Sequence, residues 1–102
     1  MFAVIFEVFV KAEGKDEYLK LASELRGFLK DREGFISIER FQSMTNKGKL
    51  LSLSFWETEE AIDEWRNLLE HRNAQELGKA RLFDSYRIQV AQVVRDYANS
   101  SS

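Results

Sequence analysis

The amino-acid sequence predicts a single α+β domain with the element order β-α-β-β-α-β. Four stretches are rich in β-branched and aromatic residues, and two stretches between them repeat apolar residues at helical spacing. A short polar turn joins the two central strands into an antiparallel hairpin. Right-handed crossovers then place both helices on one face of a four-stranded antiparallel sheet, which is the ferredoxin-like arrangement.

The first strand and the first helix are expected at residues 2–10 and 14–31. Residues 2–10 (FAVIFEVFV) are largely apolar on both alternating faces, so we expect both faces to contact protein. Gly14 and Asp16 begin the helix, and Gly34 follows it as a stop signal. The apolar stripe of this helix comprises Tyr18, Leu21, Ala22, Leu25, Phe28 and Leu29.

The central hairpin is expected at residues 35–43 (FISIERFQS) and 49–56 (KLLSLSFW). Its turn contains Asn46 and Gly48, which tolerate positive φ. The short connection makes these two strands antiparallel neighbours.

A second helix and a last strand complete the pattern. Thr58 is a good N-cap, and the acidic residues around it suit the positive end of the helix dipole. The helix carries an apolar stripe that includes Trp65, and we expect it to break near His71 and resume to about Gly78. The last strand is expected at 83–96 (FDSYRIQVAQVVRD), within a domain at 1–98 that precedes a disordered tail at 99–102.

The composition argues against several classes of function. With 15 basic and 17 acidic residues and a formal net charge of −2, the chain lacks the clustered Lys and Arg of a nucleic-acid-binding surface. It has no Cys and one His, which argues against disulfides, thiolate chemistry and a structural zinc site. The N-terminus does not resemble a signal peptide, and no apolar run approaches the roughly 20 residues that cross a bilayer. We therefore expect a cytoplasmic protein with no metal, nucleic-acid or membrane partner.

The sheet face opposite the helices predicts a homodimer. We expect that face to carry apolar residues of three strands, namely Val4, Phe6, Val8, Leu51, Leu53, Phe55, Ile88, Val90 and Val94. A monomer rarely exposes such a patch, and packing two of these sheets together in a two-fold dimer removes it from water. The alternative is a monomer whose tail covers the sheet, but residues 99–102 are too few and too polar for that.

The sheet face beneath the helices is expected to line a small-molecule pocket. We place polar and aromatic residues there among apolar neighbours, namely Glu7, Ser52, Ser54, Trp56, Arg87 and Gln89. A mixture of polar and apolar side chains is typical of pockets that bind small molecules.

Three residues could carry chemistry, and each has an alternative interpretation. Trp65 could form a flat wall for an aromatic substrate, or it could be an ordinary core anchor. His71 could be a general base, since histidine ordinarily titrates at about pH 6.5, or it could cap a helix break. Arg87 could stabilise an oxyanion or enolate, or it could form an ion pair with Glu7 or be a charge on an edge strand.

Several short motifs, in their order and spacing, resemble the antibiotic-biosynthesis-monooxygenase family over residues 2–97. The motifs are Gly34-Phe35, SFWETEEA at 54–61, Trp65, Glu70-His71-Arg72 and Tyr86-Arg87. The resemblance implies a dimeric α+β barrel with a pocket between the helices and the sheet of each subunit. Some family members oxidise anthrone-like or quinol-like aromatics with O₂ and without metal or flavin. In those enzymes a Trp, a polar ring residue and an Arg surround the substrate, and Trp65, His71 and Arg87 match these places.

Other relatives degrade haem with an Asn on the first strand, a Trp on the second helix and a haem-ligating His. Trp65 matches that Trp, whereas Glu7 or a neighbour stands at the place of the Asn, and the family His lies nearer Gln75 than His71. Three hypotheses remain open. The chain is a cofactor-free monooxygenase with His71 as base and Arg87 holding the anion, a haem-binding or haem-degrading enzyme with His71 as ligand, or a non-catalytic dimeric module for small-molecule binding or stress response.

Overall fold

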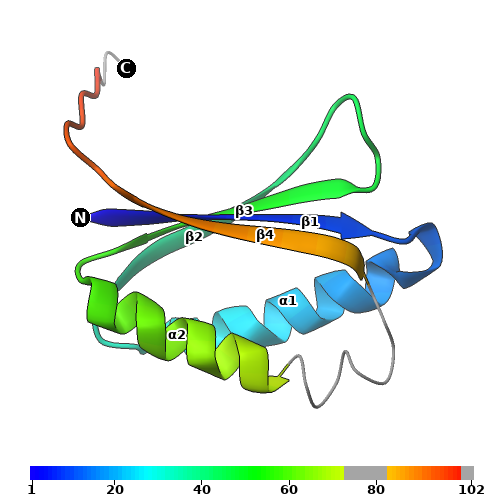
Figure 1. Ribbon diagram of the computed structural model, residues 1–102, viewed down its shortest axis with the longest axis horizontal. Helices are drawn as coiled ribbons and strands as arrows, with labels where there is room; N and C mark the ends of the chain where they lie inside the picture. Colours follow the sequence, from blue (N-terminus) through cyan, green and yellow to red (C-terminus); the bar gives the residue numbers. More distant parts are fainter. Residues whose placement is uncertain (73–82, 100–102) are drawn as a thin grey trace.

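The computed structural model describes residues 1–72 and 83–99, and it confirms the predicted order of elements (Figure 1). The strands are β1 (Phe2–Val10), β2 (Phe35–Gln42), β3 (Lys49–Trp56) and β4 (Phe83–Gln92). The helices are α1 (Lys15–Leu29), preceded by the 3₁₀ turn η1 (Ala12–Gly14), and α2 (Glu59–Arg72). None of the described helices is long and apolar enough to span a membrane. The predicted resumption of the second helix to about Gly78 and most of the predicted tail lie outside the described residues.

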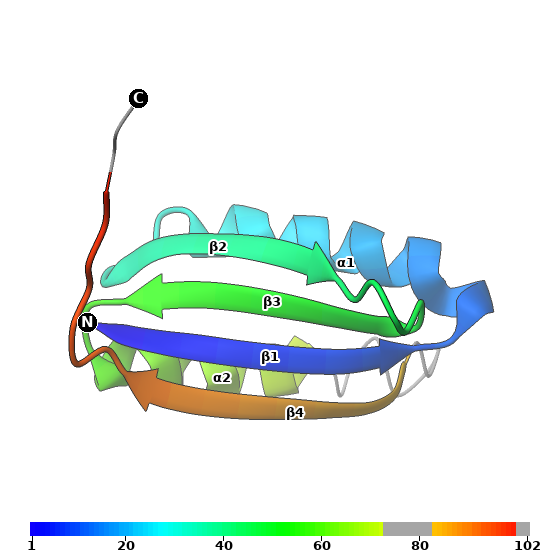
Figure 2. The same ribbon diagram turned by 90° about the horizontal axis from the view of Figure 1, so that it is seen from above.

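The four strands form one antiparallel sheet in the order β2-β3-β1-β4, and both helices lie on the same face of it (Figures 1 and 2). β1 is a central strand and β4 is its outer neighbour. β4 ends at Gln92 and not at residue 96, and its last pair with β1 is Gln92 with Phe2. After a last bond from Val93 N to Met1 O at 3.0 Å, the chain leaves the sheet.

The strand register corrects the predicted assignment of the two sheet faces. Val4 of β1 pairs with Ser54 of β3, and Phe6 pairs with Ser52, while Glu7 pairs with Leu51. Directly paired residues of antiparallel strands share a face. The helix-facing surface therefore combines Val4, Phe6, Val8, Ser52, Ser54, Trp56, Ile88 and Val90, whereas the open surface combines Ile5, Glu7, Leu51, Leu53, Phe55, Arg87 and Gln89. The sequence alone predicted the alternation within each strand but combined the strands in the wrong register.

The hydrophobic core lies between the sheet and the helices. Its least exposed side chains come from all the layers and include Val4, Val8, Leu29, Trp56 and Ile62. On α1, most of the described stripe residues are buried, but Phe28, at the edge of the stripe, is 48% exposed. Thr58 caps α2 as predicted, because its Oγ1 accepts a hydrogen bond from Ala61 N at 3.2 Å.

Candidate functional site

Two indole rings form the centre of the helix-facing side of the sheet. Trp56, the last residue of β3, and Trp65 of α2 have ring centroids 5.8 Å apart. Trp56 has no exposed surface and Trp65 is 6% exposed. At the start of β2, Phe35 packs edge-on against Trp56 with centroids 5.2 Å apart. Through these ring contacts α2 packs against the β2–β3 hairpin.

Ser52 and Ser54 lie on the same helix-facing surface as these rings, as predicted. Both are buried. Ser54 Oγ accepts a hydrogen bond of 2.9 Å from Trp56 Nε1, which satisfies an indole donor that would be costly to bury unpaired. Aromatic rings and hydroxyl groups therefore lie next to one another between the sheet and the helices.

Trp65 belongs to the buried core in the described part of the structure. It lines neither the cavity between α1 and β2 nor the smaller cavity around Gly34. The core-anchor interpretation of Trp65 therefore holds for the contacts that are described. A cavity beside Trp65 stays a prediction, because residues 73–82, which follow α2, lie outside the described part.

Glu7 and Arg87 do not join this surface, and their predicted placement beneath the helices is wrong. They pair with each other across β1 and β4, on the open face of the sheet. Arg87 is exposed, and the Glu7 carboxylate lies 3.8 Å from Lys49 Nζ. Gln89 shares the open face for the same reason of register. The sheet therefore separates Arg87 from Trp65 within one chain.

His71 stands in the last turn of α2, one residue before the end of the helix. Its side chain is outside the described part of the structure. From the rise of an α-helix, its Cα lies about 9 Å along the axis from that of Trp65. Trp65 and His71 belong to the same helix. The predicted role of His71 stays a prediction.

The sequence interpretation missed a buried pair formed by Tyr18 of α1 and Arg40 of β2. Arg40 Nη2 donates to Ala22 O at 3.1 Å, and the guanidinium also hydrogen-bonds to the Tyr18 hydroxyl. Burial raises the pKa of Tyr18, although the charge and the hydrogen bond of Arg40 act in the opposite direction. Burial also lowers the pKa of Arg40, which Tyr18 raises and the nearby Arg26 charge lowers.

A signal for this pair exists in the sequence. Arg40 alternates with Ile38 and Gln42 along β2, so it occupies a position that faces the helices. A charge at an inward-facing strand position requires a partner. The signal becomes usable only when it is known which face of β2 meets the helices.

Comparison with known proteins gives a family and two relatives. Residues 1–77 match the family described as antibiotic biosynthesis monooxygenase. The jasmonate monooxygenase ABM of Pyricularia oryzae is 41% identical over 93 residues, which cover 91% of this chain and 43% of that protein. YqjZ, an uncharacterised protein of Bacillus subtilis, is 33% identical over 94 residues, which cover 92% of this chain and 80% of that protein. The chain thus spans less than half of the Pyricularia relative.

Solved structures share the fold. SnoaB, a cofactor-independent oxygenase from Streptomyces nogalater, has a TM-score of 0.77 at 11% identity, with 96% of this chain and 97% of that chain covered. The haem degrader MhuD of Mycobacterium tuberculosis, with two haems in its active site, has a TM-score of 0.74 at 17% identity, with 96% and 100% covered. At these identities the likeness shows the fold alone, and it includes proteins with and without haem.

Proposed function

The chain belongs to the antibiotic biosynthesis monooxygenase family, and from that membership we propose that it is a cofactor-independent monooxygenase acting on a small reduced aromatic of the quinol or anthrone type. The observation that carries the proposal is the 41% identity to a named monooxygenase over 91% of this chain. Because the chain spans 43% of that relative, the proposal takes from it the class of reaction and not the substrate.

In this proposal the substrate binds beside α2, against the helix-facing side of the sheet. Trp65 provides an aromatic face for stacking, and the Trp56 ring packs against it with the two ring centroids 5.8 Å apart. Ser52 and Ser54 supply hydroxyl groups close to these rings. His71 acts as the general base at the C-terminal end of the same helix. Glu7 and Arg87 are not part of this site, because they lie on the open face.

The chemistry requires a substrate that supplies the electrons itself. His71 removes a proton from a phenol or from an activated CH₂ group, which leaves an electron-rich anion. For an anthrone, addition of O₂ at that carbon gives a peroxide, and loss of water gives the ketone. The CH₂ carbon loses four electrons, one oxygen atom enters the product and the other leaves as water. The protein holds and deprotonates the substrate, and the buried aromatic surroundings limit access of water.

Haem degradation fits the described residues less well. The resemblance to haem-degrading relatives requires a polar residue on the first strand beside Trp65, yet Glu7 points to the open face and its neighbours Phe6 and Val8 face the helices. We therefore derive no step through haem, and haem binding becomes an outcome of the test.

We also propose that the protein is a homodimer joined through the open sheet face. Both helices of the described residues lie on the other side of the sheet in both views (Figures 1 and 2). The residues that the register assigns to it include Ile5, Phe9, Leu51, Leu53 and Phe55. The apolar character that motivated the dimer is therefore retained. Leu51, Leu53 and Phe55 of the predicted set lie on this face, whereas the predicted residues of β1 and of β4 face the helices. Burial of such a surface is a driving force for association.

Oxygen consumption by metal-stripped protein with a panel of anthrones and hydroquinones tests the proposed reaction. We expect turnover without added metal, flavin or haem, and a decrease in kcat of about 10²–10⁴-fold for His71→Ala if His71 is the base. Trp65→Phe should raise KM more than it lowers kcat, because its proposed role is stacking. Lys47→Gln, in the distant β2–β3 turn, is the matched control and should leave both constants unchanged.

Two results would contradict this function. Absence of turnover on every substrate of the panel would favour a binding module. Turnover that appears only after haemin is added, with a Soret band that His71→Ala abolishes, would favour the haem hypothesis.

A further inference from the structure

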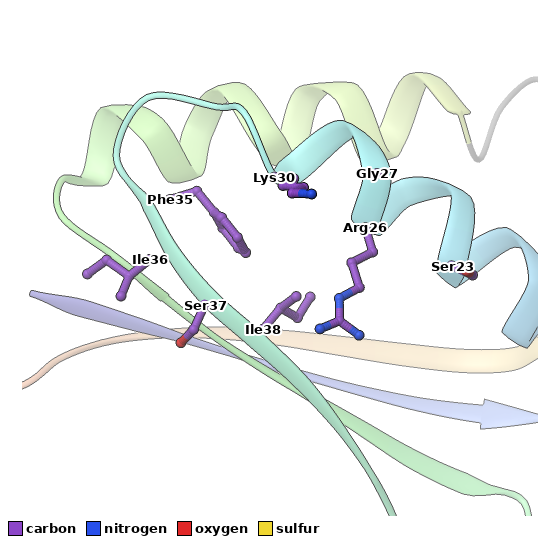
Figure 3. A pocket seen from close by; sticks show the side chains of 8 residues that line it. All are labelled: Ser23, Arg26, Gly27, Lys30, Phe35, Ile36, Ser37 and Ile38. Atoms are coloured by element: carbon purple, nitrogen blue, oxygen red, sulfur yellow. The ribbon is translucent and has the colours of Figure 1, made fainter.

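A cavity lies between α1 and β2 (Figure 3). Its volume is about 520 Å³, within the range of about 300–1,000 Å³ that is usual for small-molecule pockets. α1 contributes Ser23, Arg26, Gly27 and Lys30, and β2 contributes Phe35, Ile36, Ser37 and Ile38. Nothing in the proposed monooxygenase chemistry uses this cavity.

The helix side of the cavity is cationic. Arg26 and Lys30 lie on successive turns of α1, and Figure 3 shows Arg26 extending from the helix toward β2. Neither Arg26 nor Lys30 takes part in the two ion pairs found among the described residues, which join Arg32 to Glu64 and Lys49 to Glu7.

A third cation, Arg40, lies near Arg26 but does not line the cavity. Arg40 follows Ile38 on the same face of β2, and it donates to Ala22 O, the residue before Ser23 of the lining. Arg40 Nε is buried and has no hydrogen-bond partner among the described residues. The guanidinium of Arg26 is near enough to perturb Arg40 electrostatically. Arg26 and Lys30 therefore make the helix wall of the cavity positive, and the nearby Arg40 adds to this potential, which favours an anion there.

The strand side of the cavity is apolar except for Ser37. Phe35 and Ile38 are partly buried against the core, and Ile36 is 46% exposed. A free inorganic anion would gain nothing from these side chains, whereas the hydrocarbon part of an organic acid would be removed from water by them. The guanidinium of Arg26 matches the planar geometry of a carboxylate, which it can bind with two parallel hydrogen bonds.

We infer that the α1–β2 cavity binds a small amphipathic carboxylate. The carboxylate lies between Arg26 and Lys30, and its apolar part packs on Phe35 and Ile38, whose side chains lie on the helix side of β2 in Figure 3. The inference does not depend on the proposed oxygenase activity, since a bound acid could be a substrate, a product or a regulator. Phe35 also contacts Trp56, so an occupied cavity adjoins the aromatic cluster of the predicted site.

Isothermal titration calorimetry with two probes that share a naphthalene ring and differ in the polar substituent tests the inference without turnover. 2-Naphthoate carries the carboxylate, and 2-naphthol lacks it. We expect the wild-type chain to bind 2-naphthoate about tenfold or more tightly than 2-naphthol, because charge-assisted hydrogen bonds are the stronger kind. The double variant Arg26→Gln/Lys30→Gln should lose that preference. Gln is a good helix former, so α1 should persist.

Two further variants make the result specific to this cavity. Gly27 lines the cavity, and a Cβ at its position meets no atom within 4 Å, so Gly27→Leu projects into open space and should abolish binding of both probes. Lys47→Gln, which removes a cation at the other end of β2, should bind both probes like the wild type. Equal affinity for the two probes, no binding of 2-naphthoate, or undiminished binding by either cavity variant would overturn the inference.

Discussion

Gly34 is the residue at which backbone conformation and packing together leave no room for a side chain. Its φ is +84°, and an added Cβ would lie 2.8 Å from Ala61 Cβ of α2. Its carbonyl oxygen accepts a hydrogen bond from Glu57 N at 2.8 Å, so the loop is held against the entry to α2. The stop signal read from the sequence is thus also a close contact between two elements.

Gly34→Ala should destabilise the protein by about 1–4 kcal/mol, because it combines left-handed strain with a steric clash. Gly27→Ala is the matched control, since Gly27 lies inside α1 and its Cβ would meet nothing within 4 Å. That control should stabilise the protein by about 0.5–1 kcal/mol through helix propensity. Urea unfolding of the two variants measures both effects. A Gly34→Ala variant as stable as the wild type would contradict the proposed contact.

The buried Tyr18 phenol predicts a loss of stability at high pH. Burial raises its pKa in the folded chain, so the unfolded chain releases this proton first as the pH rises above about 10. The unfolded state then binds fewer protons than the folded state, and the free energy of unfolding decreases with pH. Urea unfolding between pH 9 and 11 should show a shallower decrease for Tyr18→Phe than for the wild type. Equal slopes would mean that Tyr18 does not contribute.

At the scale of elements, the beginning of α2 depends on one side chain. Thr58 Oγ1 accepts the hydrogen bond from Ala61 N, and Glu59 and Glu60 occupy the first turn. Thr58→Ala should cost about 0.5–2 kcal/mol, whereas Thr58→Ser keeps the hydroxyl and should cost less. Thermal unfolding monitored by circular dichroism compares the two. If Ser and Ala destabilise equally, the hydroxyl is not the stabilising group.

For the whole molecule, the open sheet face determines the expected assembly. Leu53 of β3 shares that face with Ile5 of β1, its direct partner. Leu53→Asp should yield a monomer, or unfold the chain, because a charge would be buried in the interface. Leu19→Asp, on α1, is the control for the same substitution at an exposed apolar position, and it should leave the mass unchanged. Size-exclusion chromatography with light scattering measures the mass, and a monomeric wild type would contradict the dimer.

The sequence by itself determined the features that depend on neighbouring residues. The residues of β1 and β3, the helical stripe of α1, the Thr58 cap and the Gly34 stop could all be read locally. Each follows from a spacing, a side-chain oxygen or a backbone preference within a few residues. The family resemblance rested on the same kind of local motif, and the match over residues 1–77 confirms it.

Only the tertiary structure decided which residues from different elements meet. The sequence shows that each strand has two alternating faces, but not how the faces of different strands combine. The prediction placed Val4 on the same face as Leu53, whereas in the structure Val4 pairs with Ser54. This difference of one residue places Glu7 and Arg87 on the open side of the sheet. The Tyr18–Arg40 pair and the cavity beside Arg26 likewise exist because α1 packs on β2, far along the chain from one another. Alternation is a property of a single strand, whereas register and contacts between layers depend on the packing of the complete core, which no local pattern encodes.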